Sequence, residues 1–131
     1  MKFLIGKSLK LLAVFGLLIT FIGCGKKAPV TSSTAALTTS PATLIRAIAY
    51  GSPSDAPLLL KNGADPNGAI GMGTTQITPL MVASALGKIE FVSLLLNYNA
   101  DRSASFMSYK AEDIAFYLNH REILALLSEG N

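Results

Sequence analysis

Side chains that carry chemistry are scarce in this chain of 131 residues, which has one cysteine, one histidine and 15% charged residues. The lone cysteine, Cys24, excludes an internal disulfide. The lone histidine, His120, leaves no second partner for a His/Cys metal site or for a nucleophile and its base. We therefore expect no metal, no cofactor and no catalytic residue of these classes.

Two remaining patterns also fall short of a catalytic site. Glu112 and Asp113 are adjacent, so on a helix they do not face each other, and we interpret them as solvated or capping acids. Gly68, Gly71 and Gly73 are not followed by Lys-Ser or Lys-Thr, so they do not form a phosphate-binding loop. The chain is predicted not to be an enzyme.

Basic charge is concentrated at the N-terminus. The net charge of +3 comes from 11 basic and 8 acidic residues, and three of the basic ones are Lys2, Lys7 and Lys10. From residue 41 to 131, six basic residues stand against eight acidic ones. This balance lacks the basic patch that nucleic-acid binding requires, so we do not expect a nucleic-acid partner.

Residues 1–23 are typical of a secretory signal peptide. The lysines precede an uncharged apolar run from Leu11 to Ile22, which is shorter than the ~20 residues needed to span a bilayer. The segment Phe21-Ile22-Gly23-Cys24 resembles the lipobox of bacterial lipoproteins, with Phe21 in place of the usual Leu. That resemblance implies cleavage before Cys24 and acylation of its thiol, with a plain cleaved signal or an uncleaved anchor as alternatives.

Residues 24–40 follow as Cys24 and a tether of sixteen residues, 25–40, which is rich in Ser, Thr, Ala and Pro and which we expect to be disordered. Sixteen flexible residues have a root-mean-square span of roughly 20–25 Å and a full reach of about 55 Å. Gly25 after the cysteine, rather than Asp, resembles lipoproteins sent to the outer membrane of Gram-negative bacteria. The domain is therefore expected at the periplasmic side of the envelope, close to its membrane.

The rest of the chain contains internal repeats. A shift of 36 residues moves the segment 94–101 (LLLNYNAD) onto 58–65 (LLLKNGAD), and moves Gly87 onto Gly51. A shift of 32 in the other direction moves Ala83 to Ala115 and Gly87 to Asn119. Three units near 33 residues long are the sequence signature of a stacked array, in which each unit covers the apolar face of its neighbour.

The segment from Thr78 to Asp101 resembles an ankyrin repeat, with its Thr-Pro-Leu helix start, small residues, Gly turn, second apolar helix and Ala-Asp exit. The resemblance implies an all-α fold: a short solenoid of three helix-turn-helix repeats with β-turn fingers over residues 41–131. The repeats are placed at about 41–67, 74–103 and 106–131.

Local chemistry predicts the ends of the helices. Ser40 before Pro41 and Thr78 before Pro79 supply N-cap residues with proline at the first helical position. Gly51, Gly87 and Asn119 are expected to adopt the left-handed conformation after each first helix. The third repeat carries Glu112 at a normally apolar position and is interpreted as a cap.

A binding face is the one functional site that the sequence supports. The resemblance places the fingers and the exposed side of the first helices on a continuous concave surface, and apolar or aromatic residues recur there. The candidate partner-binding residues are Tyr50, Leu86, Tyr98, Phe106, Met107, Tyr109, Tyr117 and Leu118. The alternative is that some of these side chains pack finger against finger.

These observations predict an exported, lipid-anchored and monomeric ankyrin-repeat protein that binds a protein partner without catalysis. A second hypothesis is an immunity or inhibitor protein that occludes a periplasmic toxin or hydrolase. A third is an accessory factor of a periplasmic enzyme. The sequence does not identify the partner.

Overall fold

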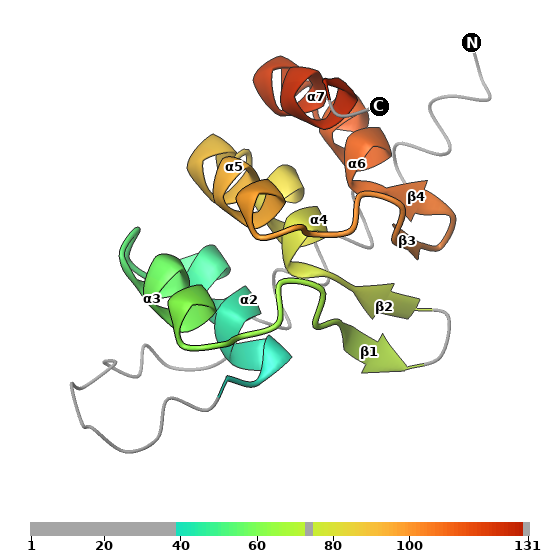
Figure 1. Cartoon of the computed structure of the whole chain (residues 1–131). Coiled ribbons are helices and arrows are strands. Elements are labelled where there is room, and N and C mark those ends of the chain that lie inside the picture. The colour runs from blue at the N-terminus through green and yellow to red at the C-terminus, as the bar shows by residue number, and fades with distance from the viewer. Residues whose placement is uncertain (1–38, 73–74, 130–131) are drawn as a thin grey trace, which may run out of the picture. The chain divides into compact units, whose positions relative to one another are not determined.

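Three helix pairs separated by two β-hairpins make up residues 39–72 and 75–129, the part of the chain that the computed structural model describes (Figure 1). The elements are α2 (Pro41–Tyr50), α3 (Asp55–Lys61), β1 (Ile70–Met72), β2 (Thr75–Ile77), α4 (Pro79–Ala85), α5 (Ile89–Asn97), β3 (Ser105–Phe106), β4 (Tyr109–Lys110), α6 (Ala111–Tyr117) and α7 (Arg121–Ser128). The predicted all-α architecture of three helix-turn-helix units with short fingers is confirmed.

The expected leader at residues 1–23, Cys24 and the tether as far as residue 38 lie outside the described residues. None of the helices that are described combines the length and apolar character needed to cross a bilayer.

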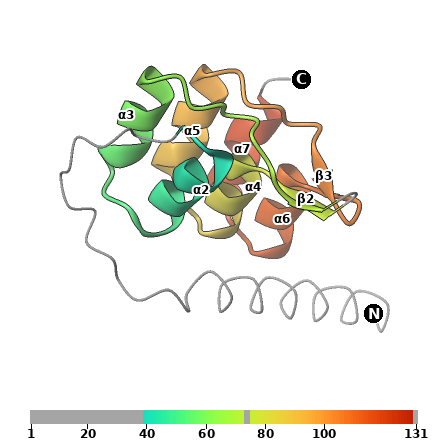
Figure 2. The same cartoon turned by 90° about the horizontal axis from the view of Figure 1, so that it is seen from below.

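The helices form two layers (Figure 2). One layer contains α2, α4 and α6, each packed against the next, and the other contains α3, α5 and α7. Each helix of the first layer also packs on its partner in the second. The core between them is aliphatic, and its most deeply buried side chains include Leu44, Ile48, Leu80, Leu95 and Ile114.

Helix starts follow the predicted chemistry in part. Thr78 caps α4, because its Oγ1 accepts a hydrogen bond from the backbone N–H of Met81 at 3.4 Å. Ser40 occupies the N-cap of α2 and Pro41 its first turn, but the Ser40 hydroxyl makes no capping bond. In α6 the carboxylate of Asp113 accepts the backbone N–H of Lys110 at 2.9 Å, which is one half of a capping box.

The turns after the first helices are of two kinds. Gly87 (φ 70°) and Asn119 (φ 61°) adopt the predicted left-handed conformation. The same prediction for Gly51 is wrong, since its backbone is extended at φ −77° and ψ 173°. The connection from α2 to α3 is one residue longer, and there the Asp55 carboxylate accepts the N–H of Ser52 at 2.9 Å.

The fingers are antiparallel hairpins. Ile70 pairs with Ile77 in the first, and Phe106 with Tyr109 in the second. The second hairpin turns through Met107 and Ser108, whose positive φ values of 50° and 72° are those of a tight two-residue turn. Strand β3 packs beside β2, so the two fingers lie next to each other (Figure 1).

Hydrogen bonds also join the loops that lead into the fingers. The Asn67 side chain accepts the backbone N–H of Asp101 at 2.6 Å and donates to the carbonyl of Asn99 at 3.4 Å. Adjacent repeats are therefore linked at this edge as well as through their helices.

Candidate protein-binding surface

An aromatic pair joins the second finger to the last first-layer helix. The ring centroids of Tyr109, on β4, and Tyr117, at the end of α6, are 5.8 Å apart with an interplanar angle of 81°. Side chains on a helix lean toward its N-terminus, which carries Tyr117 back toward the finger that precedes α6. This edge-to-face contact is the arrangement that aromatic rings prefer, and both tyrosines remain half-exposed.

Met107 extends this surface to the tip of the finger. Its side chain is 51% exposed, and it lies in the two-residue turn between β3 and β4. Methionine adapts its shape to different partners, and tyrosine adds a polar hydroxyl to a large apolar ring. We call Met107, Tyr109 and Tyr117 the finger patch.

Phe106 does not belong to the finger patch, and its prediction as a partner-binding residue is wrong. The side chain is only 5% exposed. Phe106 lies on β3, the strand that packs beside β2 of the preceding finger. The hypothesis of internal packing holds at this position.

Three other candidates lie at the opposite end of the first helices. Tyr50 ends α2, and Leu86 and Leu118 are the C-cap residues of α4 and α6. Tyr50 is 54% exposed and the two leucines are half-exposed. They occupy one equivalent position in three stacked helices and therefore form a row at the turn end, which we call the turn row.

Tyr98 stands apart from both groups. It is the C-cap residue of α5, in the other helix layer, and is 40% exposed. The structure therefore does not bring Tyr98 together with the other candidates.

Sequence reasoning missed Phe116, the most exposed of the large apolar side chains described, at 65%. Its ring centroid lies 5.9 Å from that of Tyr117, at an interplanar angle of 76°. The repeat alignment gave no signal for this exposure, since shifts of 32 and 36 place Phe116 at the positions of Ser84 and Ile48, which are both buried.

Hydrogen bonds between repeats hold the turn row in register. The Lys88 ammonium donates to the carbonyl of Ile48 at 2.7 Å and lies 3.4 Å from that of Ala49, at the end of α2. One repeat later, His120 Nε2 lies 3.4 Å from the carbonyl of Ala85. A lysine at the carboxyl end of a helix satisfies carbonyls left without helical partners and matches the helix dipole.

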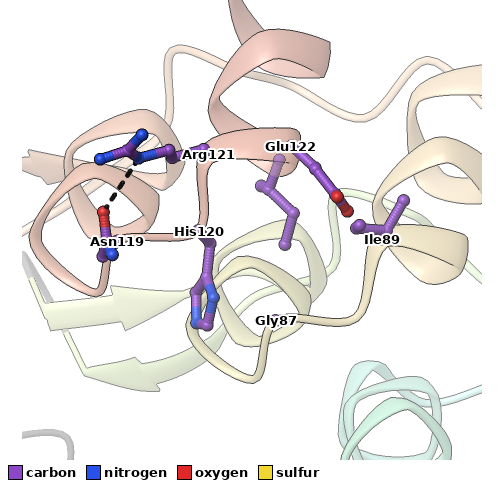
Figure 3. Close-up of a pocket in the computed structure, with 7 residues that line it drawn as sticks. Gly87, Ile89, Asn119, His120, Arg121 and Glu122 are labelled. Carbon is purple, nitrogen blue, oxygen red and sulfur yellow. Dashed lines mark hydrogen bonds between the residues drawn. The ribbon is translucent and has the colours of Figure 1, made fainter.

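His120 packs between two repeats. Its ring lies against Gly87, where an added Cβ would stand 2.8 Å from the imidazole Cε1 (Figure 3). The adjoining hollow of about 280 Å³ also involves Arg121, whose Nε donates to Asn119 Oδ1 at 3.4 Å (Figure 3). A packed ring beside a glycine turn is a stacking contact between repeats.

His120, Arg121 and Glu122 are the titratable side chains that line this hollow, and Asp101 is not among its lining residues. The Ser103 hydroxyl and backbone N–H, each donating to the carboxylate, lower the pKa of Asp101, which stands in an exposed turn. Within residues 39–72 and 75–129, no group of three His, Cys, Asp or Glu side chains could hold a metal ion. The geometry is that of a contact surface, and the absence of catalysis stays a prediction.

Comparison with known proteins agrees with this architecture. The sequence model of ankyrin repeats matches three copies over residues 44–131, about two thirds of the chain. No curated protein matches the chain. The chain belongs to the ankyrin-repeat family.

Proposed function

We propose that this protein is a membrane-anchored ankyrin-repeat protein of the bacterial periplasm that captures a protein partner through the finger patch. Its ankyrin repeats form a protein–protein interaction module. The observation that carries the choice of surface is the edge-to-face pair of Tyr109 and Tyr117, with Met107 51% exposed beside it. Tyrosine is enriched at the energetic centres of protein interfaces, since it gives much contact area for little conformational entropy.

The turn row extends the proposed contact along the array. Equivalent positions in successive repeats present Tyr50, Leu86 and Leu118 at regular intervals, as a partner lying across the stack would require. The inter-repeat hydrogen bond from Lys88 keeps this spacing fixed, so that little ordering is needed when the partner binds.

The anchor rests on the sequence. Cys24 follows an apolar segment at a lipobox-like site, and the composition of residues 25–40 is that of a short tether to the first repeat. Lipid on Cys24 would keep the repeats within ~55 Å of the membrane, so partners at the envelope surface would meet the domain at high local concentration.

Photo-crosslinking in cells tests the partner-binding surface. A photoreactive amino acid replaces Met107, at the finger tip, and in a control protein it replaces Lys61 on α3. We expect one discrete adduct from position 107 and none from position 61. An envelope-assembly protein in that adduct would support a scaffold role. A toxin or hydrolase would support the inhibitor hypothesis, and a periplasmic enzyme would support the accessory hypothesis.

Matched tyrosine substitutions then test the energetics with the captured partner. Tyr117→Ala removes half of the aromatic pair and should weaken capture by ~1 kcal/mol or more, which is at least fivefold in affinity. Tyr98→Ala removes an exposed tyrosine from the other layer and should leave affinity unchanged. Equal losses in the two folded variants would place the binding site elsewhere.

Replacement of the cysteine tests the anchor separately. Cys24→Ser should leave the precursor unprocessed and without lipid, because serine offers no thiol for acylation. Intact-mass spectrometry of the two proteins reads both features directly. An acyl-chain mass on the serine variant would refute lipidation at this position.

A further inference from the structure

One stripe of α6, formed by Glu112 and Phe116, is exposed to solvent, although the equivalent residues of the two preceding repeats are buried. Residues four apart on a helix share one face, so a two-residue stripe can be followed through the first-layer helices. In the first two repeats its four members are at most 1% exposed, whereas in the third repeat Phe116 is 65% exposed and Glu112 is exposed. The stripe consists of Leu44 and Ile48, then Leu80 and Ser84, then Glu112 and Phe116.

The second helices show the same change independently. Ala56 on α3 and Val92 on α5 are completely buried, while Leu124, at the equivalent position of α7, is half-exposed. Phe116 and Leu124 both line a hollow of about 380 Å³ at this end of the array, together with Ala115, Asn119 and Arg121. The third repeat therefore exposes the surface through which the first two repeats stack on the next one. Of the residues on this surface, only Glu112 has the polar character that we expect of a capping repeat.

The other end of the array does not match this surface. Ile114 of α6 is buried although no described repeat follows it, so its position faces the preceding repeat. Val82 holds that position in α4 and is also buried, but in α2 the residue is Arg46, which is exposed. Head-to-tail stacking of two chains would place this guanidinium where the internal contacts have an aliphatic side chain, and burying its charge costs desolvation free energy even opposite Glu112 of the other chain.

The open stripe is complementary to itself. Along α6, acidic Glu112 stands one turn before Phe116, and the exposed Arg121 follows beyond the carboxyl end of the helix. When two such stripes lie antiparallel, Glu112 of each faces Arg121 of the other and the two Phe116 rings meet near the centre. The helix dipoles also oppose each other favourably in this arrangement.

We propose that the occupant of this surface is a second copy of the chain, joined tail to tail about a twofold axis. A twofold contact closes on itself, so it covers both open ends without growing into a filament. The dimer replaces the monomer expected from the sequence. It also goes beyond the proposed function and does not depend on it, since a dimer can form whether or not the finger patch binds a partner.

The test uses the full chain in detergent, with protein mass separated from detergent mass by light scattering during size-exclusion chromatography. The parent protein should have twice the mass of one chain, and Phe116→Gln should halve it. Glu112→Arg and Arg121→Glu should each halve it too, because like charges then face each other. The double variant with both exchanges should recover the dimer, which a merely structural effect would not produce.

Two controls separate dimer formation from folding. Arg46→Glu, at the opposite end of the array, should leave the dimer intact, and circular dichroism should show the helical content of the parent in every variant. A parent chain that is monomeric at ~100 µM would overturn the proposal. So would a dimer that survives Phe116→Gln, or a double exchange that stays monomeric.

Discussion

Removal of one buried hydroxyl group should make this protein more stable. Ser84 lies in α4 at 0% exposure, between α2 and α6, and its Oγ has no hydrogen-bond partner. The equivalent residue of the first repeat is Ile48, which is buried without any polar atom. We therefore expect Ser84→Ala to raise the free energy of unfolding.

The magnitude follows from three contributions. A buried hydroxyl without a partner costs about 1–3 kcal/mol, and alanine is a better helix former than serine by roughly 0.5 kcal/mol. Against these gains, loss of the oxygen removes a few van der Waals contacts of ~0.1–0.2 kcal/mol each. The net stabilisation should be about 1–3 kcal/mol, or an increase in Tm of at least ~4 °C for a domain of this size.

Urea denaturation followed by circular dichroism measures this difference, and Ser93→Ala provides the matched control. Ser93 lies inside α5 and is half-exposed, so its replacement gains helix propensity alone. A Ser84→Ala variant that is no more stable than Ser93→Ala would refute the reasoning, because it would mean that the buried hydroxyl is hydrogen-bonded in solution.

Three further perturbations should act at the turns and between the repeats, each measured as the free energy of unfolding in urea. Gly87→Ala should destabilise by ~2–3 kcal/mol, since φ is 70° and the new Cβ would stand 2.8 Å from His120 Cε1. Gly63→Ala is the control: its φ is 91° but nothing lies within 4 Å of the added Cβ, so it should cost only the backbone strain of ~1 kcal/mol. Equal losses of stability in the two variants would contradict the steric contribution at Gly87. Lys88→Met keeps an apolar stem but removes the charged donor to the end of α2, and it should lower the free energy of unfolding by about 1–2 kcal/mol. This loss should change little with salt concentration, because the contact is part-buried. An unchanged stability would show that the bond does not hold the repeats together. The folded pKa of Asp101 lies below the ordinary 3.8, so the stability that its carboxylate contributes is present above that value and is lost as pH falls through the lowered pKa. The Asp101→Asn variant should therefore lose less stability than the parent protein between about pH 5 and pH 2. Parallel pH profiles of the two proteins would exclude this carboxylate as a source of acid sensitivity.

Much of the architecture was predictable because repetition encodes it twice. The shift of 36 residues aligned two complete units, and the helix starts at Pro41 and Pro79 followed from the missing N–H of proline. The prediction of a left-handed conformation for Gly51 was wrong because glycine allows such a turn without requiring it. The length of the following connection decided its backbone conformation.

The candidate surface was predicted less well than the fold. Phe106 and Tyr109 are neighbours across one hairpin, yet the first ring is buried and the second is half-exposed. We attribute the difference to β2 of the preceding finger, which packs beside β3, the strand that carries Phe106. Sequence spacing gives no information on which strand of a finger meets its neighbour.

The sequence by itself determined the repeat number and the helix pairs, since periodicity and capping residues are local properties. The tertiary structure decided which apolar side chains remain available. Ile48, Ser84 and Phe116 hold one position in three repeats, yet only Phe116 is exposed. Burial at that position depends on whether another repeat stacks against it, and this is a property of the assembled array.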